Sequence, residues 1–414
     1  MRSFPISRCR ICGGENLEEV FALGDLVSCG AFSSKGQPDP TSAPLQLMQC
    51  ESCGLVQLAH NFDGNDLFRL SYGYRSGLNE SMIRHLREIV FNVKYRVAFS
   101  PGDIVLDIGS NDGTLLSFYE DEKGIRRLGI DPTIAKFKSY YQSGIETVED
   151  FFTAAQYRKS VGDVQAKAIT SIAMLYDLPD PNAFVGDIAS VLAPGGLWVF
   201  EQSYLPLMVE RGSFDTICHE HLEYYGMHQI NDLLARHGLR AFDVRVNDVN
   251  GGSFQIWACH LGGPYPTNAA AVDLLLRKER LEGYLGKRPL QSLRSNAEAA
   301  RQQTLDFLEH CLASGKTVHG YGASTKGNTL LQYFGITSRL LPVIADRNPD
   351  KDGARTPGTG IPIISEEQSR AAKPDYYFVL PWHFRDAFLK RERAFIERGG
   401  KFVFPLPVFD IVTK

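Results

Sequence analysis

Two pairs of cysteines, each pair separated by two residues, form the clearest chemical pattern in the chain. Two knuckles of this spacing can surround one tetrahedral ion, in a closed site that stabilises a fold and leaves no position for a substrate. The alternatives are four unrelated buried cysteines or a zinc ribbon that binds nucleic acid, but Lys and Arg are not concentrated around the knuckles. We expect structural zinc, which the pattern alone does not distinguish from iron, at Cys9, Cys12, Cys50 and Cys53.

The sequence VLDIGSNDGT, at residues 105–114, reads as an apolar strand that runs into a glycine-containing turn and then a helix. Gly109 and Gly113 let the backbone approach a ligand closely. A dinucleotide-binding turn would require glycine at Asn111, and Asp107 places an acid in the strand. The turn therefore favours a cationic ligand without phosphate, and it resembles motif I of class I S-adenosylmethionine methyltransferases.

Acidic and aromatic residues follow the next two predicted elements. Asp131 lies in Gly129-Ile130-Asp131-Pro132, where an acidic side chain would accept hydrogen bonds from a ribose. Asp150 and Phe151 would supply a polar contact and an aromatic wall for adenine. An equally good interpretation of Asp150 is the N-terminal cap of a helix.

The HEH segment, residues 214–225, gathers imidazoles, carboxylates and phenols within twelve residues. On a helix, His221 and Tyr225 would share one face, and Glu220 and Tyr224 would form the neighbouring stripe. Such a cluster can move a proton near neutral pH. A zinc site is disfavoured because the segment lacks the HExxH spacing, and a purely structural polar helix is the remaining alternative.

A second strand-to-helix turn, at residues 319–328, contains three glycines, two hydroxyls and a lysine. Backbone N–H groups at a helix N-terminus with a nearby ammonium group make a phosphate site. Its glycine spacing differs from that of a Walker A loop. The alternative is a degenerate Rossmann fold that serves only as a lid.

The elements expected to position these groups form three units. Apolar runs at 104–109, 128–132, 168–175 and 197–203 alternate with helical stretches, which predicts a doubly wound parallel sheet closed by an antiparallel hairpin around residues 249–252. A helix capped by Asn79 precedes that sheet, and helices at 268–284 and 293–314 follow it. From Thr317 a smaller α/β layer begins. We expect a zinc module at residues 1–65, a methyltransferase core at 66–266 and a Rossmann-like α/β domain at 267–414.

Composition excludes several classes of protein. The 414 residues are 43% hydrophobic and 22% charged, which rules out wholesale disorder. A formal net charge of -4 provides no global basic field, so nucleic acid is not an expected partner. No apolar stretch is long enough to span a membrane and the N-terminus lacks a secretory h-region, so we expect a cytoplasmic protein. The oligomeric state cannot be read from the sequence.

Four parts in this order resemble the sugar C-methyltransferase family: a four-cysteine module, an LDIGSNDG core, an HEHxxYY segment and a C-terminal YGASTKGNTLL unit. The resemblance covers nearly the whole chain. It implies a class I methyltransferase fold with S-adenosylmethionine as methyl donor, and methylation at C3 of a nucleotide-linked 4-keto-6-deoxy sugar. The nucleotide, dTDP or GDP, stays open.

The resemblance also implies roles for individual residues. His221 matches the base that removes the C3 proton, so that the enolate carbon attacks the methyl group, and Glu220 matches a residue that orients the sugar. Tyr72 or Tyr74 would lie near the sugar, with interdomain packing as the alternative. Tyr224 would contact the substrate. The C-terminal unit would close over the nucleotide diphosphate, with Ser324 and Lys326 as candidates.

Two positions depart from the family pattern. Cys218 replaces a tyrosine just before HEH in some members, and Asp177 replaces a histidine, so the sugar or its C3 substituent would differ. Three rival functions remain: an O- or N-methyltransferase on a nucleotide sugar, a nucleotide-sugar-binding scaffold without activity, and an NAD-dependent oxidoreductase, which Asn111 disfavours.

Overall fold

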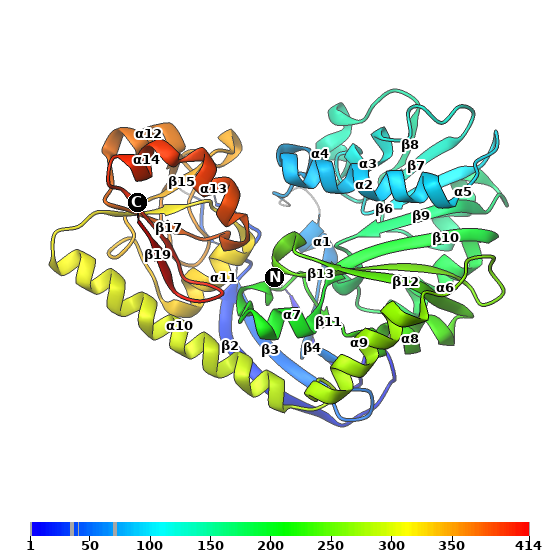
Figure 1. Ribbon diagram of the computed structural model, residues 1–414, viewed down its shortest axis with the longest axis horizontal. Coiled ribbons are helices and arrows are strands. Elements are labelled where there is room, and N and C mark those ends of the chain that lie inside the picture. The colour runs from blue at the N-terminus through cyan, green and yellow to red at the C-terminus, as the bar shows by residue number, and fades with distance from the viewer. Residues whose placement is uncertain (1, 34–36, 40, 69–72, 414) are drawn as a thin grey trace.

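The computed structural model describes residues 2–33, 37–39, 41–68 and 73–413. Tyr72, one of the two tyrosines expected near the sugar, lies outside these residues. The described chain forms sheets of two, four, seven and six strands. The two larger sheets build separate α/β units, and the long helix α10 (Arg288–Ala313) runs below the C-terminal unit (Figure 1).

The N-terminal part is a β module. Strands β1 (Ser3–Pro5) and β5 (His60–Phe62) pair with each other, and short helix α1 (Gly64–Phe68) follows. A four-stranded sheet has the order β11-β4-β3-β2, with bounds β2 (Leu17–Val27), β3 (Ser42–Cys50), β4 (Val56–Leu58) and β11 (Glu223–Tyr224). Its fourth strand therefore comes from the HEH segment, about 165 residues further along the chain than β4.

The helical prediction for the HEH segment is therefore wrong. A short 3-10 turn covers Phe214–Thr216, the chain then runs without regular structure, and Glu223–Tyr224 is extended. Glu223, Tyr224 and Tyr225 are all buried, so successive side chains are covered on both sides. Two-sided burial is typical of an interior extended segment and gives no one-faced helical pattern.

The seven-stranded sheet confirms the class I methyltransferase fold expected from the sequence. Its order is β12-β13-β10-β9-β6-β7-β8, and β13 is the one strand of this sheet that runs opposite in direction to the other six. The expected hairpin is β12–β13, and β8 lies where an element was expected before Asp150. The bounds are β6 (Ile104–Ile108), β7 (Arg126–Ile130), β8 (Ile145–Val148), β9 (Ala166–Ile172), β10 (Leu192–Ser203), β12 (Leu239–Asn247) and β13 (Ser253–His260).

Helices cover both faces of this sheet. Helix α2 (Glu80–Arg96), capped by Asn79 as predicted, packs Leu86 and Val90 in one cluster with Val105 and Trp257. Apolar residues of α5, α6 and α8 form a second cluster with the opposite faces of β6, β9 and β10. The core helices are α3 (Thr114–Ser117), α4 (Ile134–Phe137), α5 (Ala154–Val161), α6 (Pro181–Val191), α7 (Leu205–Glu210) and α8 (Met227–Arg236).

The C-terminal unit follows α9 (Ala269–Glu282) and α10, which begins five residues before the predicted start at 293. Its six strands have the order β16-β15-β14-β17-β18-β19 and run parallel except for β19. The bounds are β14 (Val318–Tyr321), α11 (Thr325–Phe334), β15 (Ile344–Asp346), β16 (Ile363–Ser365), α12 (Glu366–Ala372), β17 (Tyr376–Val379), α13 (Arg385–Arg391), α14 (Arg393–Glu397), β18 (Lys401–Phe404) and β19 (Asp410–Val412). The sheet has the Rossmann-like form that the sequence predicted.

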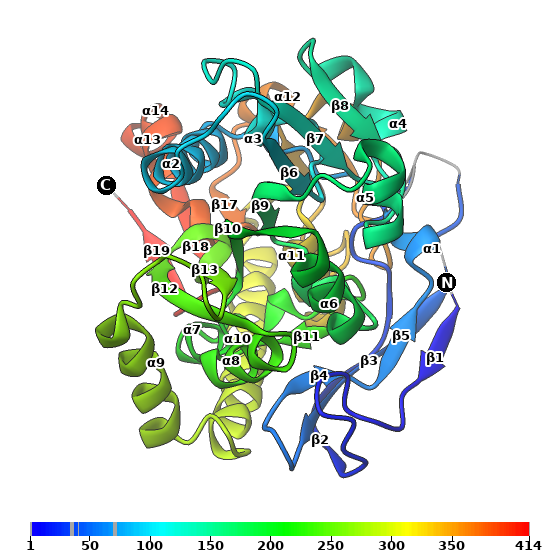
Figure 2. The ribbon, with the colours of Figure 1, turned by 90° about the vertical axis from the view of Figure 1, so that its right-hand side faces the viewer.

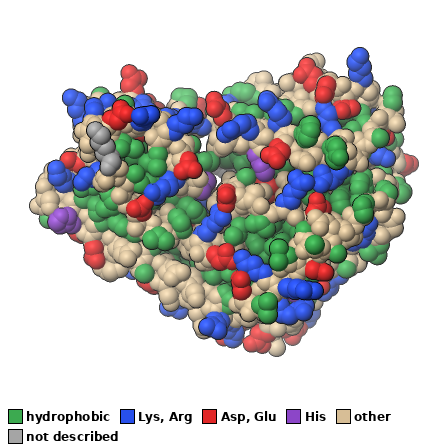
Figure 3. Space-filling model, in the orientation of Figure 1, with side chains coloured by type: hydrophobic (Ala, Val, Ile, Leu, Met, Phe, Trp, Pro, Cys, Tyr) green, Lys and Arg blue, Asp and Glu red, His purple; other side chains and the backbone are tan. Residues whose placement is uncertain are grey.

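One hydrophobic cluster joins the N-terminal sheet to the C-terminal unit. Phe21 of β2 contacts Tyr333 of α11 with ring centroids 5.8 Å apart, and Phe214 lies 5.3 Å from the same ring. Figure 2 shows the N-terminal strands beside the β11 region of the core. Acidic and basic side chains are interspersed over the face in Figure 3. Among the described residues, no helix has the length and apolar composition needed to cross a membrane.

Candidate active site and metal centre

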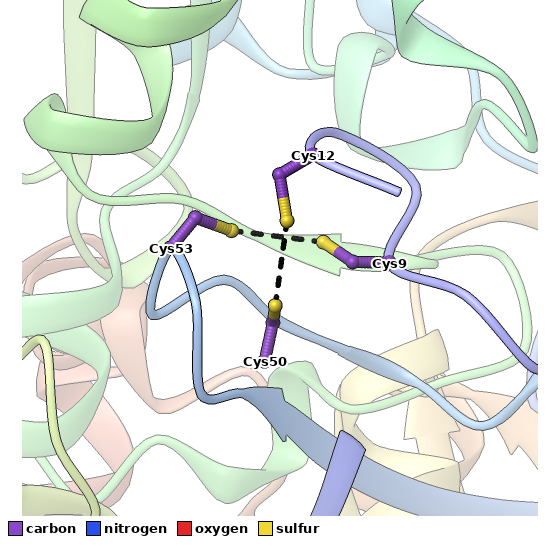
Figure 4. A group of neighbouring side chains, drawn as sticks. All are labelled: Cys9, Cys12, Cys50 and Cys53. Carbon is purple, nitrogen blue, oxygen red and sulfur yellow. Dashed lines mark hydrogen bonds between the residues drawn. The ribbon is translucent and has the colours of Figure 1, made fainter. Parts of the chain in front are cut away.

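The four cysteines of the two knuckles meet at one point. Their Sγ atoms all lie within 4.8 Å of one another, with Cys9 and Cys53 3.6 Å apart and Cys12 and Cys50 3.5 Å apart (Figure 4). Zn–S bonds of about 2.3 Å in a tetrahedron place sulfurs roughly 3.8 Å apart, so the cluster has the size of a closed zinc site. It is the one group of potential metal ligands found among the described residues.

The turns of the knuckles fit this role. Gly14 donates its N–H to the Cys12 sulfur at 3.4 Å, and a Cβ on Gly14 would lie 2.9 Å from Ser52 Oγ. The hydrogen bond from Cys53 lowers the pKa of Cys9 to about 4, whereas the same hydrogen bond raises the pKa of Cys53 and burial raises the pKa of Cys12, so Cys9 forms the thiolate that a metal requires more readily than these two cysteines. These four residues would hold zinc, which would tie both knuckles together without an open coordination position.

The turn after β6 has the backbone of a ligand cradle. Gly109, Asn111 and Gly113 all have positive φ, at 71°, 50° and 75°. A Cβ on Gly113 would lie 2.7 Å from the Tyr141 ring, which covers the turn and donates its hydroxyl to the Asn111 carbonyl at 2.9 Å. Glycine is therefore required at Gly113 for both conformation and space.

Two buried carboxyl groups flank this turn. Asp131 accepts the Asn111 N–H at 2.8 Å and the Thr133 N–H at 2.5 Å. Asp107 accepts the Thr170 hydroxyl at 2.6 Å, and burial raises its pKa to about 7. A cationic ligand would favour the ionised form of Asp107, which agrees with a sulfonium cofactor. Asp131 keeps acceptor capacity for ribose hydroxyls.

The turn also holds the segment that carries Tyr74. The Asn111 side chain accepts the Ser76 N–H at 2.9 Å and donates to the Tyr74 carbonyl at 3.1 Å. Asp112, which the sequence analysis did not select, accepts the Gly77 N–H at 2.9 Å. The Asn111 side chain thus docks this segment on the turn, while the Tyr74 side chain is 44% exposed.

Asp150 and Phe151 lie beyond β8. Asp150 accepts from the Phe151 N–H and from the Gln156 amide, whereas Thr153 caps helix α5, so the capping alternative for Asp150 is wrong. The Phe151 ring is 37% exposed and lies against Gly64. The roles of this pair toward adenine stay predictions.

His221 is held in a defined orientation. Its Nδ1 lies 2.7 Å from the Thr216 carbonyl oxygen, which can only accept, so Nδ1 carries the proton and Nε2 presents a lone pair. Burial, reinforced by the Lys326 charge, lowers the pKa of His221 to about 4. The ring is therefore neutral near pH 7, as a general base must be.

A short segment after β9 connects this histidine to the cofactor turn. The Tyr176 ring lies 4.3 Å from the His221 ring, and a Cβ on Gly109 would lie 3.4 Å from Met174. Between these contacts, Ala173 adopts a left-handed φ of 56° and donates its N–H to the Glu201 carbonyl. The segment 173–177 thus contacts both His221 and the predicted cofactor turn.

Buried polar atoms without a hydrogen-bond partner among the described residues occur in the HEH segment, in the segment after β9 and in the C-terminal unit. Burial raises the pKa of Glu220, Cys218 and Asp177. Buried polar groups are seldom left unpaired in a folded protein, so this region has the character of a binding site for a polar ligand. The unpartnered side-chain atoms are Asp177 Oδ1, Asp215 Oδ1, Glu220 Oε2, Tyr224 OH, Asn328 Oδ1 and His383 Nδ1.

The C-terminal unit reaches this region through α11. Lys326 Nζ donates to the Asn250 carbonyl in the β12–β13 turn, and its charge acts on Asp215 and His221. Ser324 caps α11 by accepting the Gly327 N–H at 3.0 Å. Trp382 Nε1 donates to Asp215 Oδ2 at 2.8 Å. The structure thus brings Lys326 close to the predicted base, while the Ser324 hydroxyl is used in the cap.

The other histidine of the HEH segment points elsewhere. His219 is fully buried, its Nε2 lies 3.1 Å from the Ala43 carbonyl, and its ring packs edge-on against Phe62. Glu220 approaches the N-terminal module at Gly30, where an added Cβ would lie 2.5 Å from Glu220 Oε1. The two histidines therefore face different neighbours.

Several groups at the site were missed by the sequence analysis. Asp215 and Asn328 belonged to segments that had been singled out, but only their burial distinguishes them. Met174 lies at the carboxyl end of the predicted apolar run 168–175, and Tyr176 follows that run directly. Ligand contacts are expected there in an α/β sheet, so strand position alone could have indicated both residues.

Comparison with known proteins gives three family matches along the chain. They are a zinc binding domain at residues 9–68, a methyltransferase domain at 74–244 and a C-methyltransferase C-terminal domain at 248–407. The C-methyltransferase NovU of Streptomyces niveus is 32% identical over 419 residues, covering 99% of this chain and 97% of the relative.

Solved methyltransferases also align with the chain. The CurJ carbon methyltransferase is 13% identical and the alignment covers 44% of this chain and 56% of that one, with a TM-score of 0.33. Magnesium protoporphyrin IX methyltransferase of Synechocystis, with bound S-adenosylmethionine, is 14% identical, with coverages of 44% and 82% and a TM-score of 0.32.

Proposed function

Because the chain belongs to the S-adenosylmethionine-dependent C-methyltransferase family, we propose that it methylates C3 of a nucleotide-linked 4-keto-6-deoxy sugar. The observation that carries this proposal is the geometry of His221. Its Nδ1–H is engaged by Thr216, its Nε2 is free to accept a proton, and its pKa is low enough to keep the ring neutral. A C–H proton next to a ketone is the kind of acid that such a base can remove.

The proposed reaction assigns a separate role to the base and to the residues of the cofactor site. His221 accepts the C3 proton, and the electron pair left behind forms the enolate with the 4-keto oxygen. S-adenosylmethionine, when bound, supplies the electrophilic methyl group. The residues that would hold it are Asp107, Gly109, Asn111, Gly113 and Asp131, with Asp150 and Phe151 toward the adenine.

Other groups bind and orient the sugar nucleotide. Burial raises the pKa of Glu220, so its carboxyl group can donate a hydrogen bond as well as accept one. Tyr224 and Tyr74 would complete the sugar pocket. Lys326, close to His221, would pair with the diphosphate, and the cap at Ser324 would aim the α11 N-terminus at the same group.

The experiment is incubation of the protein with S-adenosylmethionine and a panel of dTDP- and GDP-linked 4-keto-6-deoxy sugars, read by mass spectrometry and NMR. A gain of one methyl at C3 supports the proposal. A methyl at C5, the other carbon next to the ketone, would keep the mechanism and change the position. A methyl on oxygen or nitrogen would refute carbon methylation of these sugars.

A further inference from the structure

The arginine between the first two cysteines is buried against the segment that carries the base. The Arg10 side chain is 2% exposed, and its neighbours Cys9 and Ile11 are buried as well. A guanidinium without solvent must satisfy its donors internally. The acceptors of the Arg10 hydrogen bonds therefore indicate which parts of the chain this side chain holds together.

The guanidinium of Arg10 donates to carbonyl and side-chain oxygens from three neighbouring stretches. NH1 donates to the Leu58 carbonyl at 2.8 Å and to the Leu222 carbonyl at 3.4 Å, and NH2 donates to the His60 carbonyl at 2.9 Å. Nε donates to Asn61 Oδ1 at 3.0 Å. Only a planar fork can serve this many acceptors in fixed directions.

Glu223 places a carboxyl group against Arg10; burial raises the pKa of this group, and the Arg10 charge opposes that rise. Its side chain is 0% exposed and its Oε1 lies 3.4 Å from Arg10 Nε, while neither carboxylate oxygen has a hydrogen bond among the described residues. Glu223 begins strand β11, which pairs with Gln57 and Val56 of β4. The ion pair therefore joins the cysteine knuckle to the start of this strand.

Leu222, which follows the base directly, is fixed on both sides. Its N–H donates to the Tyr176 carbonyl at 2.7 Å, and its carbonyl accepts from the Leu58 N–H at 2.8 Å and from Arg10. The knuckle itself is anchored to the core, because Asn182 Nδ2 donates to the Arg10 and Ile11 carbonyls at 2.9 Å each.

We propose that Arg10 is a positioning residue for His221, which couples the first cysteine knuckle to the HEH segment through Leu222 and Glu223. The inference rests on the proposed function of His221. Metal binding would fix the conformation of the first cysteine knuckle, and the knuckle in turn fixes the position of the Arg10 guanidinium. The guanidinium then holds the Leu222 carbonyl, in the peptide next to His221. The zinc module then sets the geometry of proton removal without touching the substrate.

The test compares Arg10→Lys and Glu223→Gln with Arg8→Lys as the matched control. Arg8 lies two residues away, pairs with Glu15 and is 67% exposed. In the first two variants we expect kcat to fall about 100-fold, the loss that a misplacement of roughly 1 Å can cause. KM for the sugar and Kd for S-adenosylmethionine should stay within twofold, and zinc should remain at one per chain. The control should match the wild type.

Hydrogen–deuterium exchange supplies a readout that needs no substrate. Amides of residues 217–225 should exchange faster in both variants, while those of 104–131, around the cofactor turn, should not change. Wild-type kcat in both folded variants would overturn the proposal. So would a joint loss of kcat, cofactor affinity and zinc in both, which would mean general unfolding. If the wild type methylates no keto sugar, the proposed function fails, and the exchange data still decide whether Arg10 holds the segment.

Discussion

Proton removal at C3 should persist at a pH where an ordinary histidine would already be protonated. Burial lowers the pKa of His221 from the usual value of about 6.5 to about 4. At pH 5.5 a base with a pKa of 4 is ~97% neutral, whereas one with a pKa of 6.5 is ~9% neutral. The structure therefore predicts that the rate of proton removal stays nearly level from pH 8 down to pH 5.5 and falls only as pH approaches 4.

The assay measures exchange of the C3 proton in deuterated buffer by NMR, without S-adenosylmethionine, from pH 4.5 to 8. Spontaneous exchange of the keto sugar is subtracted. His221→Asn is the matched variant, because an amide can still donate to the Thr216 carbonyl but cannot act as the base. Its exchange rate should fall roughly 100- to 10,000-fold.

The same pKa shift affects stability, and the direction matters for the assay. As pH falls, His221 is protonated at a higher pH in the unfolded state than in the folded protein. The contribution of neutral His221 to the free energy of unfolding is therefore complete above about pH 6.5 and is lost as pH falls toward 4, by about 3 kcal/mol in all. Exchange at low pH must therefore be measured briefly, with circular dichroism as a check on folding. A half-maximal rate near pH 6.5 in folded protein, or wild-type exchange by His221→Asn, would refute the assignment of the base.

Three further predictions concern the other parts of the site. Gly113→Ala should weaken S-adenosylmethionine binding about tenfold or more by calorimetry, because a left-handed conformation costs alanine about 1–2 kcal/mol and the Tyr141 ring blocks the added carbon. The control is Gly102→Ala, where the backbone is also left-handed but the added carbon meets open space, and the affinity should not change. Lys326→Met should raise KM for the nucleotide sugar roughly 10- to 100-fold through loss of a charged hydrogen bond, and an unchanged KM would remove Lys326 from the diphosphate site. Cys12→Ser should lower zinc per chain in elemental analysis and lower Tm, and unchanged metal content would contradict the site.

The central fold could be predicted because its signals are local. Apolar runs of strand length, the turn at Gly109–Gly113 and the hairpin at 249–252 each follow from neighbouring residues, and the sheet contains them in the expected places. The two cysteine knuckles were also readable, since the CxxC spacing itself makes the turn that presents two sulfurs.

The N-terminal sheet was missed although part of its signal was present. Strand β3 buries Ala43, Leu45 and Leu47 at every second position, which is the period of a strand covered on one face. The Pro and Ser content of the preceding stretch is typical of a loop and obscures this alternation. The extended form of residues 223–225 had no such local signal, because it depends on pairing with β4.

The contacts around His221 could not be predicted for the same reason. Tyr176 comes from a different chain segment, and its ring centroid lies 4.3 Å from that of His221 only in the folded protein. Thr216 lies five residues before His221, but its carbonyl reaches Nδ1, at 2.7 Å, through a local turn that the residue types do not specify. The lowered pKa follows from that burial, not from any residue beside the histidine in sequence.

The position of β11 at the edge of the N-terminal sheet has a consequence for how the protein is made. Strand β4 leaves the ribosome about 165 residues before its partner, which at about 5–20 residues per second is a delay of roughly ten to thirty seconds. During this interval the edge of β4 is unpaired, and the acceptors of Arg10 at Leu222 do not yet exist. We therefore expect the first 68 residues to be a poor fragment for separate expression, and chaperones that shield exposed strand edges to improve the yield of the whole chain.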